Sequence, residues 1–221
     1  HASRRCGVSR SLTSPLTPAR PAQACACQYD PRMPTDCTNA TFPSRKPDGY
    51  KAQCNWACRC PLSCAGRELE RGTSPRLQVF KHPHKGWCLR TLSPIEKDAF
   101  IMEYVAERID SDAVRSRKAS FPTMDNYLMQ VAKGAGVQLD AYYVRNIAAF
   151  AAFACQTKFA NMTKTTWLGH HWDKMTCHAV FVAKRNIDPG EELTYLRSDA
   201  SPVAASPFNC QCGDPECSGR V

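Results

Sequence analysis

The sequence lacks any long hydrophobic run. Its 221 residues contain no stretch near the roughly 20 consecutive apolar residues that a membrane-spanning helix needs. The N-terminal segment also lacks the apolar core of a signal peptide, and the chain begins with His1 rather than Met, which predicts a fragment or a processed form. These absences argue against a membrane-spanning helix and against a secretion signal.

Acidic residues are missing from the first 29 positions, which carry Arg4, Arg5, Arg10 and Arg20. The whole chain has a net charge of +9, from 29 Lys and Arg against 20 Asp and Glu. Residues 1–24 are rich in Ser, Thr and Pro, so we predict a disordered basic tail there. A contact between this tail and nucleic acid or a nucleosome is the alternative.

Cysteine is abundant, with 14 residues, and two kinds of protein could explain that number: a secreted disulfide protein or an intracellular zinc protein. The cysteines form dense local clusters, with Cys-x-Cys pairs at Cys25–Cys27 and Cys210–Cys212. Such pairs are awkward as mutual disulfides and natural as thiolates around a metal. Two Asn-x-Thr triplets, at Asn39 and Asn161, argue only weakly for secretion. The spacing therefore favours structural zinc.

Composition divides the chain into four parts. After the tail, residues 25–75 contain seven cysteines and little aliphatic content, so metal must hold this segment together. Residues 76–197 are predicted to form the core domain. Hydrophobic residues make up 43% of the chain, which is enough to build a buried core. Residues 198–221 comprise a polar linker and the last cysteine cluster.

The core domain is predicted to be mainly β with few helices, arranged in small sheets. Runs of β-branched and aromatic residues bounded by turn signals predict strands over 76–81, 87–92, 99–105, 126–131 and 177–185. A helix is expected over 111–119, capped by Ser111 or Asp112. The Ala-rich stretch 146–154 is also expected to be helical, and Pro189-Gly190 to form a turn before a short strand.

Six motifs occur in a fixed order: "QCNWACRCPLSC" (53–64), "LQVFKHPHKGWCLRTL" (77–92), "AFIMEYVAE" (99–107), "DAYYVRNIA" (140–148), "AVFVAKRNIDPGEELTY" (179–195) and "FNCQCGDPECSG" (208–219). Together they resemble the SET-domain lysine methyltransferases, in the heterochromatin-type branch with cysteine-rich pre-SET and post-SET segments. Active members of that branch methylate histone H3 on lysine nine. The resemblance covers roughly residues 25–219.

The resemblance implies a set of binding residues. S-adenosylmethionine would contact Gly86, Trp87 and Tyr127, and zinc in the post-SET site would be held by Cys155, Cys210, Cys212 and Cys217. The family's pre-SET cluster uses nine cysteines around three zinc ions. Here the candidates fall short of nine, even if the distant Cys6 is counted: Cys25, Cys27, Cys37, Cys54, Cys58, Cys60 and Cys64.

One motif departs from the family. The stretch "NIAAFAAFAC" (146–155) aligns with a family pattern that ends Arg-Phe-Ile-Asn-His-Ser-Cys. The Arg position is Ala149, the Asn and His positions are Ala152 and Phe153, and Cys155 remains. A buried polar group of the cofactor that loses its partner costs about 1–3 kcal/mol. These replacements therefore predict weak or absent cofactor binding.

The catalytic tyrosine of the family is also replaced. Its position holds Arg197, a permanent cation with no acceptor atom, which is repulsive beside a sulfonium and useless as a base. Tyr195 remains, at the position that lines the lysine channel in the family. Cys88 stands where the family has a second glycine, and Arg145 replaces another family glycine.

Two functions follow from the resemblance and its departures. By family the chain is a histone-lysine N-methyltransferase; by its replaced residues it is a pseudoenzyme that acts as a zinc-stabilised scaffold in the nucleus, on chromatin. The histone H3 tail or nucleosome, and other chromatin proteins, are the implied partners.

A third reading assigns residues 149–176 to an erroneous gene model or a deliberate mutation, because 157–176 also matches the family poorly. Glu103 could contact the cofactor or pair with a neighbour, and the pairing is favoured. Cys88 and Cys177 are expected to be ordinary buried thiols.

Overall fold

The computed structural model describes residues 51–54, 58, 60–121, 127–131, 136–168, 177–196, 209–210, 215 and 217. The predicted tail over 1–24 lies outside the described residues, as do Cys25, Cys27, Cys37, Cys212 and Arg197. The expectations for those positions therefore stay predictions.

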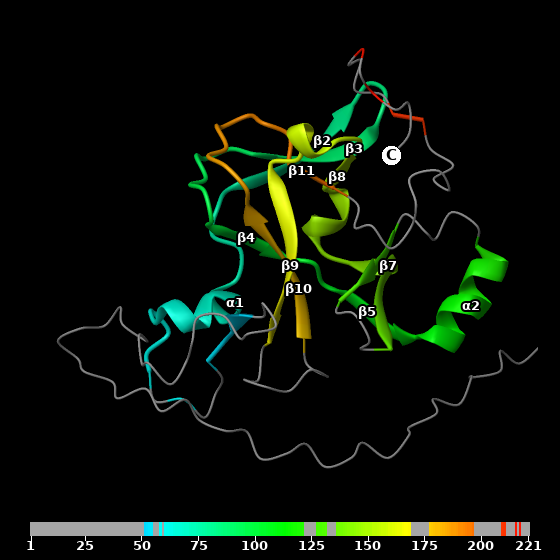
Figure 1. Cartoon of the computed structure of the whole chain (residues 1–221), viewed down its shortest axis with the longest axis horizontal. Helices are drawn as coiled ribbons and strands as arrows, with labels where there is room; N and C mark the ends of the chain where they lie inside the picture. Colours follow the sequence, from blue (N-terminus) through cyan, green and yellow to red (C-terminus); the bar gives the residue numbers. More distant parts are fainter. Residues whose placement is uncertain are drawn as a thin grey trace, which may run out of the picture.

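Three small sheets make up the described part of the chain (Figure 1). The largest has the order β4-β10-β9-β11-β8, with β1 added beside β9. Its strands are β1 (Lys51–Ala52), β4 (Phe100–Glu103), β8 (Ala152–Ala154), β9 (Met162–Leu168), β10 (Cys177–Ala183) and β11 (Thr194–Leu196). β10 runs antiparallel to both β4 and β9, whereas β11 runs parallel to β8 and β9.

The two smaller sheets flank this one. β2 (Leu77–His82) and β3 (Gly86–Thr91) form an antiparallel hairpin. The third sheet has the order β5-β7-β6 and consists of β5 (Ala106–Asp110), β6 (Leu128–Gln130) and β7 (Val137–Arg145).

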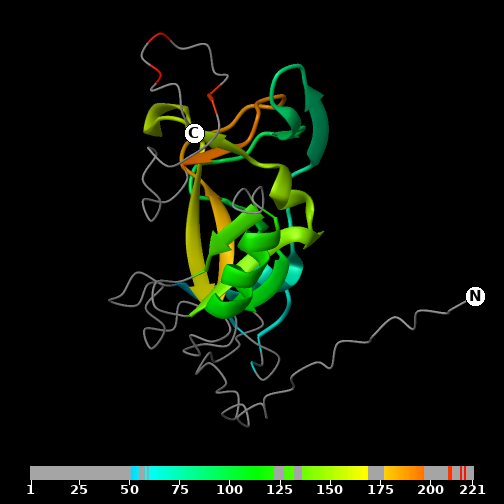
Figure 2. The ribbon, with the colours of Figure 1, turned by 90° about the vertical axis from the view of Figure 1, so that its right-hand side faces the viewer.

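Within the described residues, helical segments are few and short. They are α1 (Glu68–Arg71), α2 (Ser111–Ser120) and the 3₁₀ turns η1 (Ala65–Arg67), η3 (Ile147–Phe150) and η4 (Thr157–Phe159). Figures 1 and 2 show α2 lying outside the β5-β7 sheet, at the edge of the molecule. Of its ten residues only Val114 is buried. None of the described helices has the length and apolar character needed to cross a membrane.

The main core lies between the large sheet and β3 and β7. Its centre is formed by Phe181, Leu89, Ile101 and Met102, each fully buried. Phe181 lies in β10, between β4 and β9, and this strand is buried at five of its seven positions. Removing this much aliphatic and aromatic surface from water is the main force that holds the small sheets together.

The expected fold class is confirmed, and each predicted strand corresponds to an observed one. The helix over 111–119 is also confirmed, but the predicted cap is wrong. Asp110 caps α2, because its Oδ1 accepts a hydrogen bond from the N–H of Ala113 at 2.8 Å. Asp110 ends β5 in an extended conformation, so its carboxylate reaches the third N–H of the helix.

The prediction of a helix over 146–154 is wrong beyond Phe150. After a single 3₁₀ turn the backbone becomes extended at Ala151, and Ala152–Ala154 form β8 alongside β11. Helix propensity summed over so short a window is a weak prior. Pairing with β11 and burial against the core outweigh it here.

Candidate functional site

The apolar segment that follows Asn146 is fixed by the side chain of that residue. Its Oδ1 accepts hydrogen bonds from the N–H groups of Val105 at 3.2 Å and Ala148 at 3.3 Å. Its Nδ2 donates to the carbonyl oxygen of Glu103 at 2.8 Å. The end of β4 and the start of η3 are therefore held together, and the position of the following residues is set.

The segment itself offers few hydrogen-bonding groups. Its side chains are the Ile147 side chain, the methyl groups of the alanines and two phenyl rings, half-buried against the main core except for the buried Ala148 and Ala154. The N–H groups of Ala149, Ala151 and Ala152 already donate to main-chain carbonyl oxygens at 3.1 to 3.2 Å. A polar ligand would thus meet mostly carbon along this stretch.

Tyr195 is a packed residue of the core. It pairs with Phe153 across β11 and β8, and the two ring centroids are 5.1 Å apart. Its other neighbour is Phe181, with a centroid distance of 4.7 Å. Contact with two aromatic rings fixes the orientation of the Tyr195 ring. The candidate catalytic position 197 follows two residues later, outside the described residues.

Strand β3 presents the glycine-tryptophan pair and lies against η3. Gly86 has a φ of +81°, a conformation that favours glycine, and the space where a Cβ would lie is open. The Trp87 side chain is 61% exposed. Cys88 is buried, and burial, together with the nearby Glu192, raises the pKa of its thiol to about 11. A thiol of that kind is an inert packing group, and the expected burial of Cys88 and Cys177 is confirmed.

Tyr127 is covered on one face by a cation. The guanidinium of Arg145 lies 4.7 Å from its ring centroid, and the edge of Tyr142 is nearby at a centroid distance of 5.8 Å. The Tyr127 carbonyl oxygen accepts a hydrogen bond from the hydroxyl of Tyr104 at 3.1 Å. From the sequence, Arg145 was identified only as a replaced glycine, and no sequence signal paired it with Tyr127. A cation over the face of an aromatic ring is attracted by the ring.

Glu103 pairs with a neighbour, as expected. Its Oε1 lies 2.6 Å from Nδ1 of His178 on the adjacent strand β10, and both side chains are about a quarter exposed. This contact accounts for Glu103 without a ligand.

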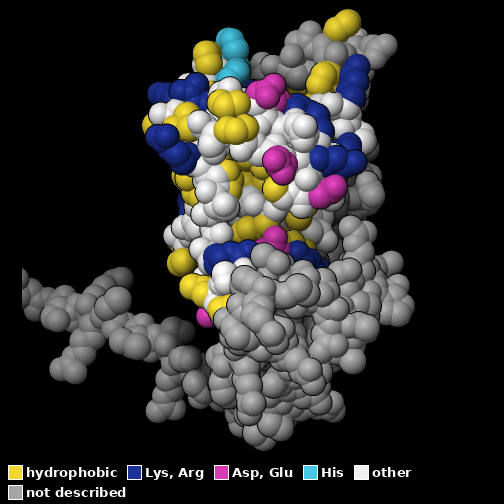
Figure 3. Space-filling model, turned by 90° about the vertical axis from the view of Figure 1, so that its left-hand side faces the viewer, with side chains coloured by type: hydrophobic (Ala, Val, Ile, Leu, Met, Phe, Trp, Pro, Cys, Tyr) yellow, Lys and Arg dark blue, Asp and Glu magenta, His cyan; other side chains and the backbone are white. Residues whose placement is uncertain are grey.

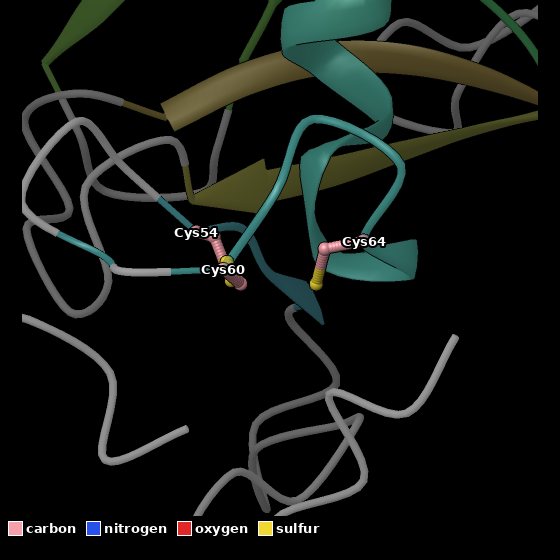
Figure 4. Close-up of side chains that lie close together, drawn as sticks. All are labelled: Cys54, Cys60 and Cys64. Carbon is pink, nitrogen blue, oxygen red and sulfur yellow. The ribbon is translucent and has the colours of Figure 1, made fainter. Parts of the chain in front are cut away.

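The first cysteine cluster is formed by Cys54, Cys60 and Cys64, whose sulfur atoms all lie within 4.8 Å of one another (Figure 4). All three side chains are buried, and Cys58 belongs to the same buried group. Cys60 and Cys64 are thiols rather than halves of a disulfide. Buried thiols at this separation fit the donor set of a closed zinc site.

Arg67 supports this cluster. Its side chain is 6% exposed; Nε donates to the Cys60 sulfur at 3.4 Å and a terminal nitrogen donates to the Cys58 carbonyl oxygen at 2.9 Å. Burial by itself raises the pKa of the Cys60 thiol. Hydrogen bonds with Arg67 and with the neighbouring Cys54 and Cys64 outweigh that effect, so the pKa lies below its ordinary value. Arg67 was not predicted from the sequence, although a basic residue three positions after Cys64 was a usable signal.

A second cluster joins the core to the C-terminal part. The sulfur atoms of Cys155, Cys210 and Cys217 lie within 4.8 Å of one another. Cys155 directly follows β8, so a metal here would tie the end of the apolar segment to the residues after 208.

The fold and the two clusters define a class of protein. Residues 86–196 match the family described as the SET domain, and the chain belongs to that family, in its heterochromatin-type branch.

Several relatives illustrate this. The human histone-lysine N-methyltransferase EHMT1 is 30% identical over 168 residues, which cover 75% of this chain and 12% of the relative. An Arabidopsis thaliana protein named "Probable inactive histone-lysine N-methyltransferase SUVR2" is 30% identical over 181 residues, covering 76% of this chain and 25% of the relative. The crystal structure of Arabidopsis thaliana SUVH6 in complex with SAM has a TM-score of 0.67 and 26% identity, covering 80% of this chain and 38% of that one. The chain thus spans a small part of each of these relatives.

The residues of the apolar segment do not fit S-adenosylmethionine as hydrogen-bonding partners. The cofactor carries a sulfonium, an ammonium, a carboxylate and an adenine amine. Ala149, Ala152 and Phe153 provide no polar side-chain atom, and the N–H groups of the two alanines are already bonded. A polar group of a ligand buried against them would lose its partners.

Proposed function

We propose that this SET-domain protein transfers methyl groups poorly or not at all and acts as a zinc-stabilised scaffold on chromatin. The carrying observation is the apolar segment Ala149–Ala154, which keeps its place in the fold while offering no polar side chain. Lysine methylation requires a methyl donor held in line with a neutral amine, and positioning of this kind supplies much of the rate. Weak binding of the donor would remove that contribution.

Arg197 supports the same proposal from the sequence. It stands at the position of the family's catalytic tyrosine and offers only cationic donors. Tyr195 remains at the lysine-channel position, and its buried ring between Phe153 and Phe181 supports a structural role there.

Zinc is proposed at both clusters. Cys54, Cys60 and Cys64, with the buried Cys58, would hold the pre-SET end; the remaining candidates Cys25, Cys27 and Cys37 would complete it. Cys155, Cys210 and Cys217 would hold the post-SET end, with Cys212 as the fourth ligand. Tetrahedral thiolate sites of this kind supply folding free energy directly.

The proposed partner is the histone H3 tail within a nucleosome, and the proposed location is chromatin in the nucleus. The names of the relatives as histone-lysine N-methyltransferases support this. A groove for a basic tail should be acidic. Among the described residues on the face shown in Figure 3, basic side chains are interspersed with acidic ones and form no acidic patch. We therefore expect the H3 contact on another face.

An active methyltransferase with an atypical site is the alternative. It is favoured by the Gly86–Trp87 pair, which keeps an open glycine with positive φ on β3. In that case main-chain atoms of β3 and the ring of Tyr127 would have to hold the donor without help from Ala152 or Phe153.

The deciding experiment incubates the purified zinc-loaded chain with S-adenosylmethionine and either an H3 N-terminal peptide or nucleosomes, followed by mass spectrometry. We expect no methylation above background, while an active SET methyltransferase run in parallel modifies the same substrates. Chain-dependent methylation of H3 would establish the alternative.

The scaffold half of the proposal needs its own measurement. Titration of the chain with a labelled H3 tail peptide and with nucleosomes should show saturable binding that does not require S-adenosylmethionine. If neither substrate binds, the chromatin scaffold is refuted whatever the methylation result.

A further inference from the structure

Helix α2 carries a basic pattern that the methyltransferase fold does not explain. Its second half reads "RSRKAS" (115–120) and ends at Ser120. Arg117 and Arg115 lie three and five residues before Ser120. No other Ser or Thr in the sequence has a Lys or Arg at both of these positions.

Ser120 is accessible at the end of the helix. It is the last residue of α2, its side chain is exposed, and its hydroxyl donates to the Ser116 carbonyl oxygen at 3.4 Å. A ten-residue helix with one buried side chain, Val114, is marginal by itself. Entry into an enzyme groove in an extended form therefore requires local opening of the last turn, in which Arg117 leaves its bonds to Glu107 and Asp140.

We propose that Ser120 is a phosphorylation site for a protein kinase whose acidic substrate groove reads the arginines three and five residues upstream. Charge patterns of this kind are a common basis of kinase–substrate selection. In the reaction the Ser120 oxygen attacks the γ-phosphorus of ATP. The bond from that phosphorus to the bridging β–γ oxygen breaks, ADP leaves, and the hydroxyl proton passes to the base of the kinase.

The phosphate would act on a nearby ion-pair network. Arg117 donates two hydrogen bonds to Glu107, each at 2.7 Å, and one to Asp140 at 2.6 Å. These bonds fasten α2 to β5 and β7. Ser120 lies three residues after Arg117, so a phosphate there shares its helix face and competes for the same guanidinium. It also places negative charge at the negative end of the helix.

Breaking the bonds of Arg117 would also affect Tyr127 and Asn146, because β7 connects Asp140 to both. Asp140 is fully buried, and its Oδ1 also accepts a hydrogen bond from the N–H of Tyr142 at 2.8 Å. The same strand ends at Arg145, beside Tyr127 and directly before Asn146. Loss of the Arg117–Asp140 contact therefore makes β7 more mobile up to Arg145, next to Tyr127 and Asn146.

The first test treats the purified zinc-loaded chain with ATP and a kinase that prefers arginine at these two positions, and maps phosphate by mass spectrometry. We expect one phosphate on Ser120, none there in Ser120→Ala, and unchanged modification of Ser120 in the matched control Ser116→Ala. Arg115→Ala should slow the reaction about tenfold or more. This residue is a clean probe, because its side chain is 80% exposed and its ion pair with Asp112 lies on the surface.

Two outcomes would overturn the proposal. One is failure of Ser120 to accept phosphate in the folded chain while a free peptide of residues 111–124 does so. The other is an Arg115→Ala rate equal to that of the unaltered chain.

Hydrogen exchange then tests the coupling. Phosphorylated chain should exchange amide protons at least tenfold faster over 111–121 and 137–142 than kinase-treated Ser120→Ala. Unchanged exchange would refute the link from Ser120 to β7.

Discussion

Replacing Arg117 with methionine should be strongly destabilising. The methionine keeps an unbranched apolar stem but removes the charge that faces two carboxylates of different burial. Asp140 has a fully buried side chain, whereas Glu107 is 40% exposed. A buried charge left without its partner costs about 3–5 kcal/mol, and an exposed ion pair contributes about 0–1 kcal/mol. The loss of stability in Arg117→Met should therefore come almost entirely from the unpaired, buried Asp140.

Three variants separate the two contributions. In urea unfolding of zinc-loaded protein, Arg117→Met should lower the free energy of unfolding by about 3–5 kcal/mol. Glu107→Gln, which keeps the Asp140 pair, should lower it by about 1 kcal/mol or less. Asp140→Asn leaves a neutral buried amide, so its loss in free energy of unfolding should lie between those of Arg117→Met and Glu107→Gln. If Glu107→Gln costs as much as Arg117→Met, burial of Asp140 is not what makes the network important.

Three further predictions concern the site, the metal and pH. The double change Ala152→Asn plus Phe153→His restores polar groups and should tighten S-adenosylmethionine binding, measured by calorimetry, at least tenfold, since each satisfied group contributes about 1–3 kcal/mol. Phe153→Leu is the control. Equal affinities of the double variant and the control would contradict the idea that the pocket has lost its polar partners. Cys64→Ser should lower both zinc content and melting temperature, whereas Cys88→Ser should keep its zinc; full zinc content in Cys64→Ser would remove that residue from the cluster. The hydrogen bonds from Arg117 hold the pKa of Glu107 below its ordinary value of 4.5, so the stability from this pair is present above that pH and is lost as pH falls through the folded pKa. The stability difference between the unaltered chain and Glu107→Gln should therefore shrink in acid, and a difference independent of pH would refute the assignment.

Sequence patterns predicted strands whose buried residues are simple apolar runs. β10 is such a strand, because Ala179 to Phe181 are all fully buried. β7 and β9 were not predicted. β7 has the buried carboxylate of Asp140 in its middle, and β9 has Thr and Lys side chains at four of its seven positions, so neither shows the expected pattern. Their hydrogen bonds come from pairing on both sides, of β7 with β5 and β6 and of β9 with β10, β11 and β1.

The candidate site was predictable to the extent that it depends on residue type. Cysteine spacing indicated both clusters, and the sulfur atoms of six described cysteines lie together in two groups of three. The supporting contacts of Arg67 and Arg145 were not predicted. The place of Arg67 shortly after Cys64 was a usable signal, whereas the contact of Arg145 with Tyr127 depends on which ring the end of β7 meets. The four proposed segment boundaries stay predictions.

Main-chain bonding of β8 has an evolutionary consequence. The strand is held by main-chain pairing with β11 and by apolar packing of Phe153 and Ala154, so the fold needs no polar side chain in β8. A lineage can therefore lose the polar residues of this strand one at a time and keep a folded protein. Natural selection for the shape can then continue after selection for the reaction has ended.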